Sequence, residues 1–137
     1  MRMYPQVSFL KRNKVSIGIV VTLFLLELLY LLNRDILRPL YTSNEVVVVL
    51  LGSLPNFLAA LGVSLALIPI CLRWGDKKVG RSFVYLVSII CWGLLLQEEI
   101  TPFAFGSCVS DVNDMIASTM GTAVGIAFYE ILVLGQS

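Results

Sequence analysis

The chain has 137 residues, of which 58% are hydrophobic and only 14% are charged. Soluble domains are about 25% charged, so this composition leaves too little polar surface for a water-soluble globule and excludes a soluble enzyme domain. A net charge of +1 gives no indication of nucleic-acid binding. The absence of histidine removes the commonest general base and metal ligand. We therefore expect a membrane protein.

The first apolar run, residues 15–32, is long enough to cross a bilayer, because about 20 helical residues span about 30 Å of hydrocarbon. Glu27 is its one charged residue. Basic residues precede the run as they do in a signal peptide, but no cleavage site of the small-x-small kind follows it. The run is therefore predicted to be a retained membrane anchor.

The second apolar run, residues 46–72, is too long for one untilted span and contains Pro55. Ser53 can cap a helix that carries a proline in its first turn. This pattern predicts a span over residues 54–72, with residues 45–53 as an interfacial segment or a helix extension. A single kinked helix is the alternative.

Two further apolar runs, residues 82–97 and 112–134, complete four predicted spans joined by short connections. Backbone polar groups in lipid must be satisfied within the protein, and the alternation typical of a β-barrel is absent. We expect one all-α domain, an integral membrane four-helix bundle.

The basic residues predict the orientation of this bundle. Eight of the ten lie before the first span or between the second and third, so the positive-inside rule places both termini in the cytoplasm. Those eight are Arg2, Lys11, Arg12, Lys14, Arg73, Lys77, Lys78 and Arg81. The loop formed by the last four sets topology and contacts anionic lipid, or alternatively docks a cytoplasmic partner.

Acidic residues gather on the opposite, outer side of the predicted bundle, and Glu27 lies in the outer half of the first span. Asp111 and Asp114 open the fourth span, where capping and the helix dipole offer an alternative explanation for both. Glu99 closes the third span, where a carboxylate opposes the dipole. The candidate ligand-binding residues at this acidic mouth are Glu27, Asn56, Glu99, Asp111, Asp114 and Ser118.

Glu27 is the most costly residue of the chain, because a carboxylate within a span must be neutral, paired or hydrated. Arg34 lies seven residues later on the same helix face, and Asn33 lies beside it. Snorkelling of Glu27 toward these residues is the alternative to a place in the acidic mouth.

Gly121 and Gly125 form a small-xxx-small pattern, which predicts close helix packing within the bundle or between protomers. Cys71, Cys91 and Cys108 lie far apart, without the C-x-x-C spacing of a metal site. We expect Cys108 to be an unpaired thiol, with an interchain disulfide as the alternative. No catalytic constellation is recognised, so we do not expect an enzyme.

The segment Glu99–Gly125 (EITPFAFGSCVSDVNDMIASTMGTAVG) resembles the VanZ-like family of small integral membrane proteins. The resemblance makes Glu99 the glutamate that ends the penultimate helix, and Asp111 and Asp114 the paired acids of the last helix. It also implies a bacterial cell (inner) membrane location, and the family takes its name from resistance to a teicoplanin-type antibiotic. The loop here lacks the family's arginine, and Ser118 stands where an asparagine is usual. Less compensated acids favour a bound cation, such as a divalent ion, or a shifted pKa, and no other cofactor is expected.

Three functions follow from this pattern. The first is a VanZ-like envelope protein whose acidic mouth engages a cell-wall ligand, with a divalent cation bridging any lipid phosphate. The second is an oligomeric scaffold or accessory subunit with a membrane or cytoplasmic partner. The third is a small channel-like effector, for example in prokaryotic defence, which requires an oligomer.

Overall fold

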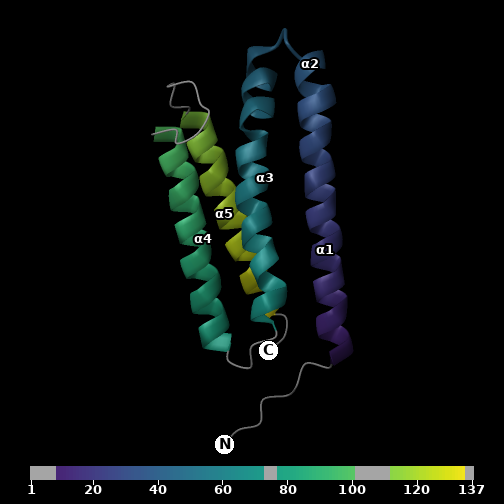
Figure 1. Ribbon diagram of the computed structural model, residues 1–137, viewed down its shortest axis with the longest axis vertical. Helices are drawn as coiled ribbons and strands as arrows, with labels where there is room; N and C mark the ends of the chain where they lie inside the picture. Colours follow the sequence, from purple (N-terminus) through teal and green to yellow (C-terminus); the bar gives the residue numbers. More distant parts are fainter. Residues whose placement is uncertain (1–8, 73–76, 101–111, 135–137) are drawn as a thin grey trace, which may run out of the picture.

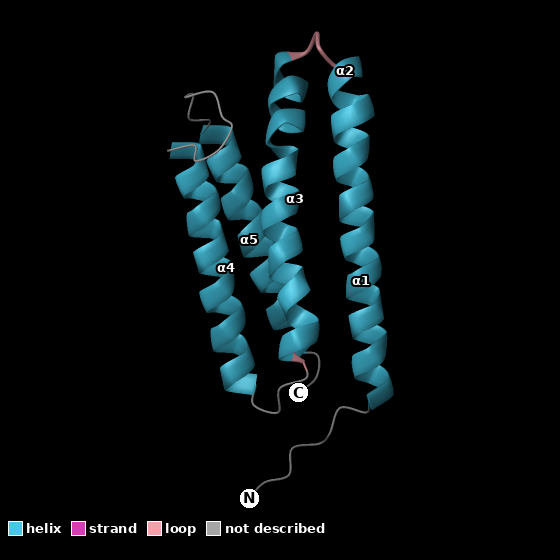
Figure 2. Ribbon diagram, in the orientation of Figure 1, coloured by secondary structure: helices cyan, strands magenta, loops and turns pink. Residues whose placement is uncertain are grey.

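The computed structural model describes residues 9–72, 77–100 and 112–134, and within them four long helices run alternately up and down (Figure 1). Helix α1 (Phe9–Leu32) continues through a π-helical turn, η1 (Asn33–Leu37), into the short helix α2 (Arg38–Leu40). Helices α3 (Glu45–Cys71), α4 (Lys77–Ile100) and α5 (Val112–Leu134) follow. Figure 2 shows no strand in this part of the chain, so the predicted all-α class is confirmed.

Each of these four helices is long and apolar enough to cross a membrane. The spans found this way cover Asn13–Leu40, Glu45–Cys71, Lys77–Glu98 and Val112–Leu132. Helix α5 has the predicted bounds. Helix α1 extends beyond its predicted start, and α4 extends beyond its predicted span at both ends, in each case by including charged residues. Charged helix ends are expected where a helix leaves the apolar layer, because long basic side chains reach the interface.

Helix α3 is continuous from Glu45 to Cys71, so residues 45–53 form the helix extension rather than a separate interfacial segment. The expectation that Ser53 caps a helix is wrong. The cap is Asn44, whose side-chain oxygen accepts hydrogen bonds from the backbone N–H groups of Val46 (3.1 Å) and Val47 (3.4 Å). Ser53 lies inside the helix and donates to the carbonyl oxygen of Val49 at 3.0 Å.

Helix α3 is the central element of the bundle. It packs against α1 on one side and against α4 and α5 on the other, as Figure 1 shows. Within the described helices, α1 contacts neither α4 nor α5. The position of α1 therefore depends on its seam with α3.

The seam between α3 and α5 is closed by the two glycines of the small-xxx-small pattern. A Cβ atom added at Gly121 would collide with the carbonyl oxygen of Phe57, and one added at Gly125 would collide with the Ser64 side chain. Only hydrogen at these positions lets the two backbones approach so closely. These contacts run in the same order along both helices, so α3 and α5 are parallel.

The interior is apolar at one end and rich in hydroxyl groups elsewhere. The buried apolar cluster consists of Ile19, Leu65, Ile68, Cys71, Val84 and Tyr129. Ser53, Ser64, Ser88, Ser118 and Thr122 are also buried. Several of the hydroxyls donate within their own helix, as Ser64 does to the Ala60 carbonyl at 3.0 Å. Large apolar side chains such as Phe24, which is 69% exposed, point outward as expected for a surface covered by lipid.

Gly121→Ala should lower the stability of the bundle, because the added methyl group meets the α3 backbone rather than a flexible side chain. We expect a loss of about 1–3 kcal/mol, the usual cost of overpacking. Gly93→Ala is the matched control, since a Cβ there has nothing within 4 Å and alanine favours a helix. Unfolding in detergent followed by circular dichroism measures both. Equal effects of the two substitutions would contradict the close packing at Gly121.

Candidate functional site

An open groove of about 570 Å³ lies along the seam between α1 and α3. It contains one carboxylate, Glu27, and one carboxamide, Asn56, in an otherwise mainly apolar wall. The groove is lined by Leu23, Leu26, Glu27 and Tyr30 from α1, and by Pro55, Asn56, Leu58, Ala59, Gly62 and Val63 from α3. We call it the Glu27 groove.

Glu27 is exposed on the surface of this groove. Among the residues that the structure describes, none forms a hydrogen bond or ion pair with its carboxylate. Arg34 pairs with Asp35 instead, at 2.7 Å from Nε to Oδ1. Its guanidinium also lies over the Tyr30 ring, 5.8 Å from the centroid. The expected alternative, in which Glu27 snorkels to Arg34, is therefore not the arrangement found.

Pro55, which lines the groove, leaves a backbone carbonyl of α3 without its usual hydrogen-bond donor. Proline has no backbone N–H, so the carbonyl of Leu51, four residues earlier, lacks its usual helical donor. The side chain of Asn33 donates to this carbonyl from Nδ2 at 2.9 Å. Arg38 donates to it from Nε at 3.0 Å and to the Gly52 carbonyl from Nη2 at 2.6 Å. The end of the first span thus supplies the hydrogen-bond donors that the proline removes from α3. We call these hydrogen bonds from Asn33 and Arg38 the clamp.

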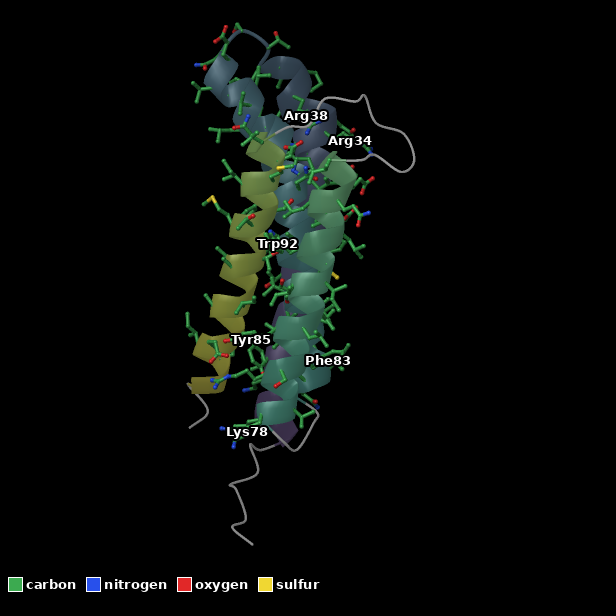
Figure 3. All side chains as sticks on the ribbon, turned by 90° about the vertical axis from the view of Figure 1, so that its left-hand side faces the viewer. Arg34, Arg38, Lys78, Phe83, Tyr85 and Trp92 are labelled. Atoms are coloured by element: carbon green, nitrogen blue, oxygen red, sulfur yellow. The ribbon has the colours of Figure 1, made fainter. Side chains whose placement is uncertain are left out.

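Asn33 and Arg38 reach α3 because the first span ends in the π-helical turn η1. A π turn holds one more residue than an α turn and rotates the following side chains about the axis. Asn33 is completely buried, while Arg38 remains exposed at the end of the bundle, where Figure 3 labels it near Arg34. Sequence reasoning missed this clamp. Its signal was a proline inside an apolar run, with Asn and Arg closing the run before it.

The structure brings together two of the predicted site residues, Glu27 and Asn56, on either side of the Glu27 groove. Asp114 and Ser118 belong to α5, which packs on another side of α3, and Ser118 is only 1% exposed. The side chain of Glu99 and all of Asp111 lie outside the described residues. The described part of the acidic mouth is therefore divided between two seams of α3.

A second polar cluster joins α4 to α5 at the end where α4 begins. Glu130 forms an ion pair with Arg81 and accepts a hydrogen bond from the Tyr85 hydroxyl at 2.9 Å. Figure 3 shows Tyr85 and Lys78 toward this end of the bundle. Nearer the other end, the Trp92 indole N–H donates to the Thr119 hydroxyl at 2.9 Å. Sequence reasoning missed the pairing of Arg81 with Glu130, which requires knowing which helices are neighbours.

The predicted basic loop is described only in part. Arg73 lies outside the described residues, Lys77 and Lys78 are exposed in the first turn of α4, and Arg81 is held by Glu130. Lys77, Lys78 and Arg81 lie at the same end of the bundle as Lys14 of α1, and Arg34 and Arg38 lie at the other. The sequence asymmetry of basic residues is thus also an asymmetry in space.

The described residues contain no group of three or more Cys, Asp or Glu side chains that could hold a metal ion. Cys71 is buried, Cys91 is partly buried, and both are free thiols. Cys108 lies outside the described residues, as does part of the acidic mouth. The divalent cation suggested by the sequence stays a prediction.

No family model, curated protein or solved structure matches this chain. The VanZ-like resemblance of its C-terminal segment also stays a prediction.

The clamp predicts a thermodynamic coupling between Asn33 and Pro55. Asn33→Leu should cost about 1–2 kcal/mol of stability, because the Leu51 carbonyl loses a buried donor. In a Pro55→Ala background the restored N–H of residue 55 can bond that carbonyl, so the same substitution should cost less than about 0.5 kcal/mol. Unfolding of the two single variants and the double variant in detergent measures the coupling. Additive effects would show that Asn33 does not compensate for Pro55.

Proposed function

We propose that this chain is a multi-pass protein of the bacterial cell membrane that binds a cationic or polar group of an envelope component in the Glu27 groove. The observation that carries the proposal is the combination of an exposed carboxylate and a carboxamide in one open groove with mainly apolar walls. Groups of this kind fix the orientation of a ligand whose remaining surface contacts apolar side chains. The proposal assigns binding, not catalysis, to the site.

The distribution of basic residues supports an orientation with both termini in the cytoplasm. Lys14, Lys77, Lys78 and Arg81 lie at the end where α1 begins and α5 ends. The positive-inside rule associates such an end with the cytoplasm. The Pro55 break and the Asn33 and Arg38 clamp then lie toward the outer side, and the Glu27 groove opens below them.

Membership of the VanZ-like family is part of the proposal. It rests on the segment Glu99–Gly125, of which the structure describes the part that begins α5. The packing of Gly121 and Gly125 against α3 agrees with the role that the resemblance gives them. A contribution to teicoplanin-type resistance, and a divalent cation shared by Glu99, Asp111 and Asp114, remain expectations from that resemblance.

A role as an accessory subunit or scaffold is the second candidate. It is favoured by the peripheral position of α1, which contacts only α3 among the other long described helices. Its outward face carries large side chains that are more than half exposed, among them Ile17, Val20, Phe24 and Leu28. In this second candidate a partner protein covers this face. Such a partner would itself be the envelope component of the proposal above.

The proposal is tested by comparing dodecylamine with dodecanol, two probes that share an apolar chain and differ in charge. Wild-type protein should retain the amine at least about tenfold more tightly, because a hydrogen bond to a charged group contributes about 1.5–3 kcal/mol. Native mass spectrometry of the detergent-solubilised protein measures retention of each probe. Glu27→Gln should remove the preference for the amine.

Glu98→Gln is the control for this experiment, since Glu98 is an exposed carboxylate on α4, which does not contact α1 within the described residues. It changes the net charge by the same amount and should leave the preference intact. An amine preference that survives Glu27→Gln would overturn the proposal.

A further inference from the structure

The depth of Glu27 limits what kind of cation can reach it. Asn56, which shares the groove with Glu27, lies eleven residues into α3, or about 16 Å from the start of that helix at 1.5 Å per residue. Helix α5 gives a similar depth, because Gly121 lies beside Phe57 and nine residues, about 14 Å, into its helix. The apolar layer of a bilayer is about 30 Å thick. Glu27 therefore lies well inside it, below the level at which lipid headgroup amines reside.

The upper end of the groove also opposes a cation that arrives from the outer solution. Helix carbonyls point toward the residue four positions later, so the guanidinium of Arg38 on the Leu51 and Gly52 carbonyls lies next to Pro55 and Asn56. This guanidinium is a positive charge at the outer entrance of the Glu27 groove. A cation that pairs with Glu27 is expected to enter from the side, through the lipid.

The walls of the groove suit a helix. They extend over about two turns of α1, from Leu23 to Tyr30, and over a similar length of α3. Ala59 and Gly62 lie on one face of α3, three residues apart. Small residues on a helix face let a neighbouring helix approach closely. A Cβ atom at Gly62 would have only Leu23 Cδ2 within 4 Å, at 3.9 Å, so this wall is open rather than filled by α1.

A second copy of this chain does not supply the required charge. In the described spans the basic residues nearest the middle are Arg34 and Arg81, and both are already paired, with Asp35 and Glu130. Two copies that met groove to groove would place Glu27 against Glu27, which like-charge repulsion disfavours. Charge complementarity therefore favours a different protein with a basic side chain within its own span.

We infer that the Glu27 groove is the docking site for a transmembrane helix of a partner protein, and that this helix carries a single Lys or Arg at the depth of Glu27. This inference rests on the proposed function and identifies the cationic envelope component. The partner's basic side chain pairs with Glu27, Asn56 supplies a neighbouring polar group, and Ala59 and Gly62 admit the partner's backbone. Intramembrane pairs of this kind satisfy two charges that are each costly alone.

The inference is tested with two synthetic transmembrane helices of leucine and alanine, identical except for one lysine or one glutamine at mid-span. Energy transfer between labelled peptide and labelled full-length protein in phosphatidylcholine vesicles measures their association. The lysine peptide should bind wild type at least about tenfold more tightly than the glutamine peptide. Glu27→Gln should abolish this difference, and Glu98→Gln should preserve it.

A steric variant separates the shape of the groove from its charge. Gly62→Leu keeps the carboxylate and places a large side chain in the groove, where an added Cβ atom meets only Leu23 Cδ2 at 3.9 Å. Circular dichroism in detergent checks that the variant folds. The substitution should weaken binding of the lysine peptide at least about fivefold, because the partner helix loses its close approach to this wall. A lysine peptide that binds the Gly62→Leu protein as tightly as wild type would overturn docking on this wall.

The remaining outcomes distinguish the inference from the proposed function. If wild type retains dodecylamine through Glu27 but binds the two peptides equally, the helix inference fails and the proposed function stands. If neither the amine nor the lysine peptide shows a Glu27-dependent preference, both fail. Glu27-dependent energy transfer between two labelled copies of this chain, without added peptide, would also overturn the inference by showing that the groove serves self-association.

Discussion

The hydrogen bonds to the Leu51 carbonyl are the constraint on which the rest of the α1–α3 arrangement depends. Pro55 removes the donor that this carbonyl would have within α3, and a membrane's apolar layer would offer no water to replace it. Asn33 and Arg38 supply the donors from the end of the first span. Because α1 contacts no other long described helix, these bonds fix its register on α3 and so place Glu27 opposite Asn56.

The two seams of α3 then differ in a way that gives the bundle its asymmetry. Toward α5, Gly121 and Gly125 bring the two backbones into close contact. Toward α1, the contact is made at the clamp and along the apolar seam, while the flank that carries Glu27 stays open. Helices α3 and α5 are thus a closely packed parallel pair, and α1 contacts this pair only through α3.

Hydropathy predicted the four helices and, for α5, both of its ends, because the length of an apolar run reports directly on the thickness it must cross. It could not predict that α3 continues through Pro55, since the compensating donors come from another helix. The same limit applies to the acidic mouth. A sequence gives the depth of Glu27 and Asp114, but their rotation about each helix axis and the neighbouring helix are tertiary facts. The tertiary contacts place Glu27 and Asn56 in one groove, whereas Asp114 lies on α5, which packs on another side of α3.

The few charges in the described helices also show why Glu27 stands apart. Glu130 is held by Arg81 and Tyr85, Arg38 by two backbone carbonyls, and Arg34 by Asp35. Each of these arrangements satisfies a charge from within the chain. Glu27 lies nearer the middle of its span than any of these groups, and no partner for it exists among the described residues. Because a charged side chain near the middle of a span costs about 2.5–3.5 kcal/mol, the fold alone gives no reason to keep a carboxylate there. The reason is best sought in a group that the protein meets in the membrane.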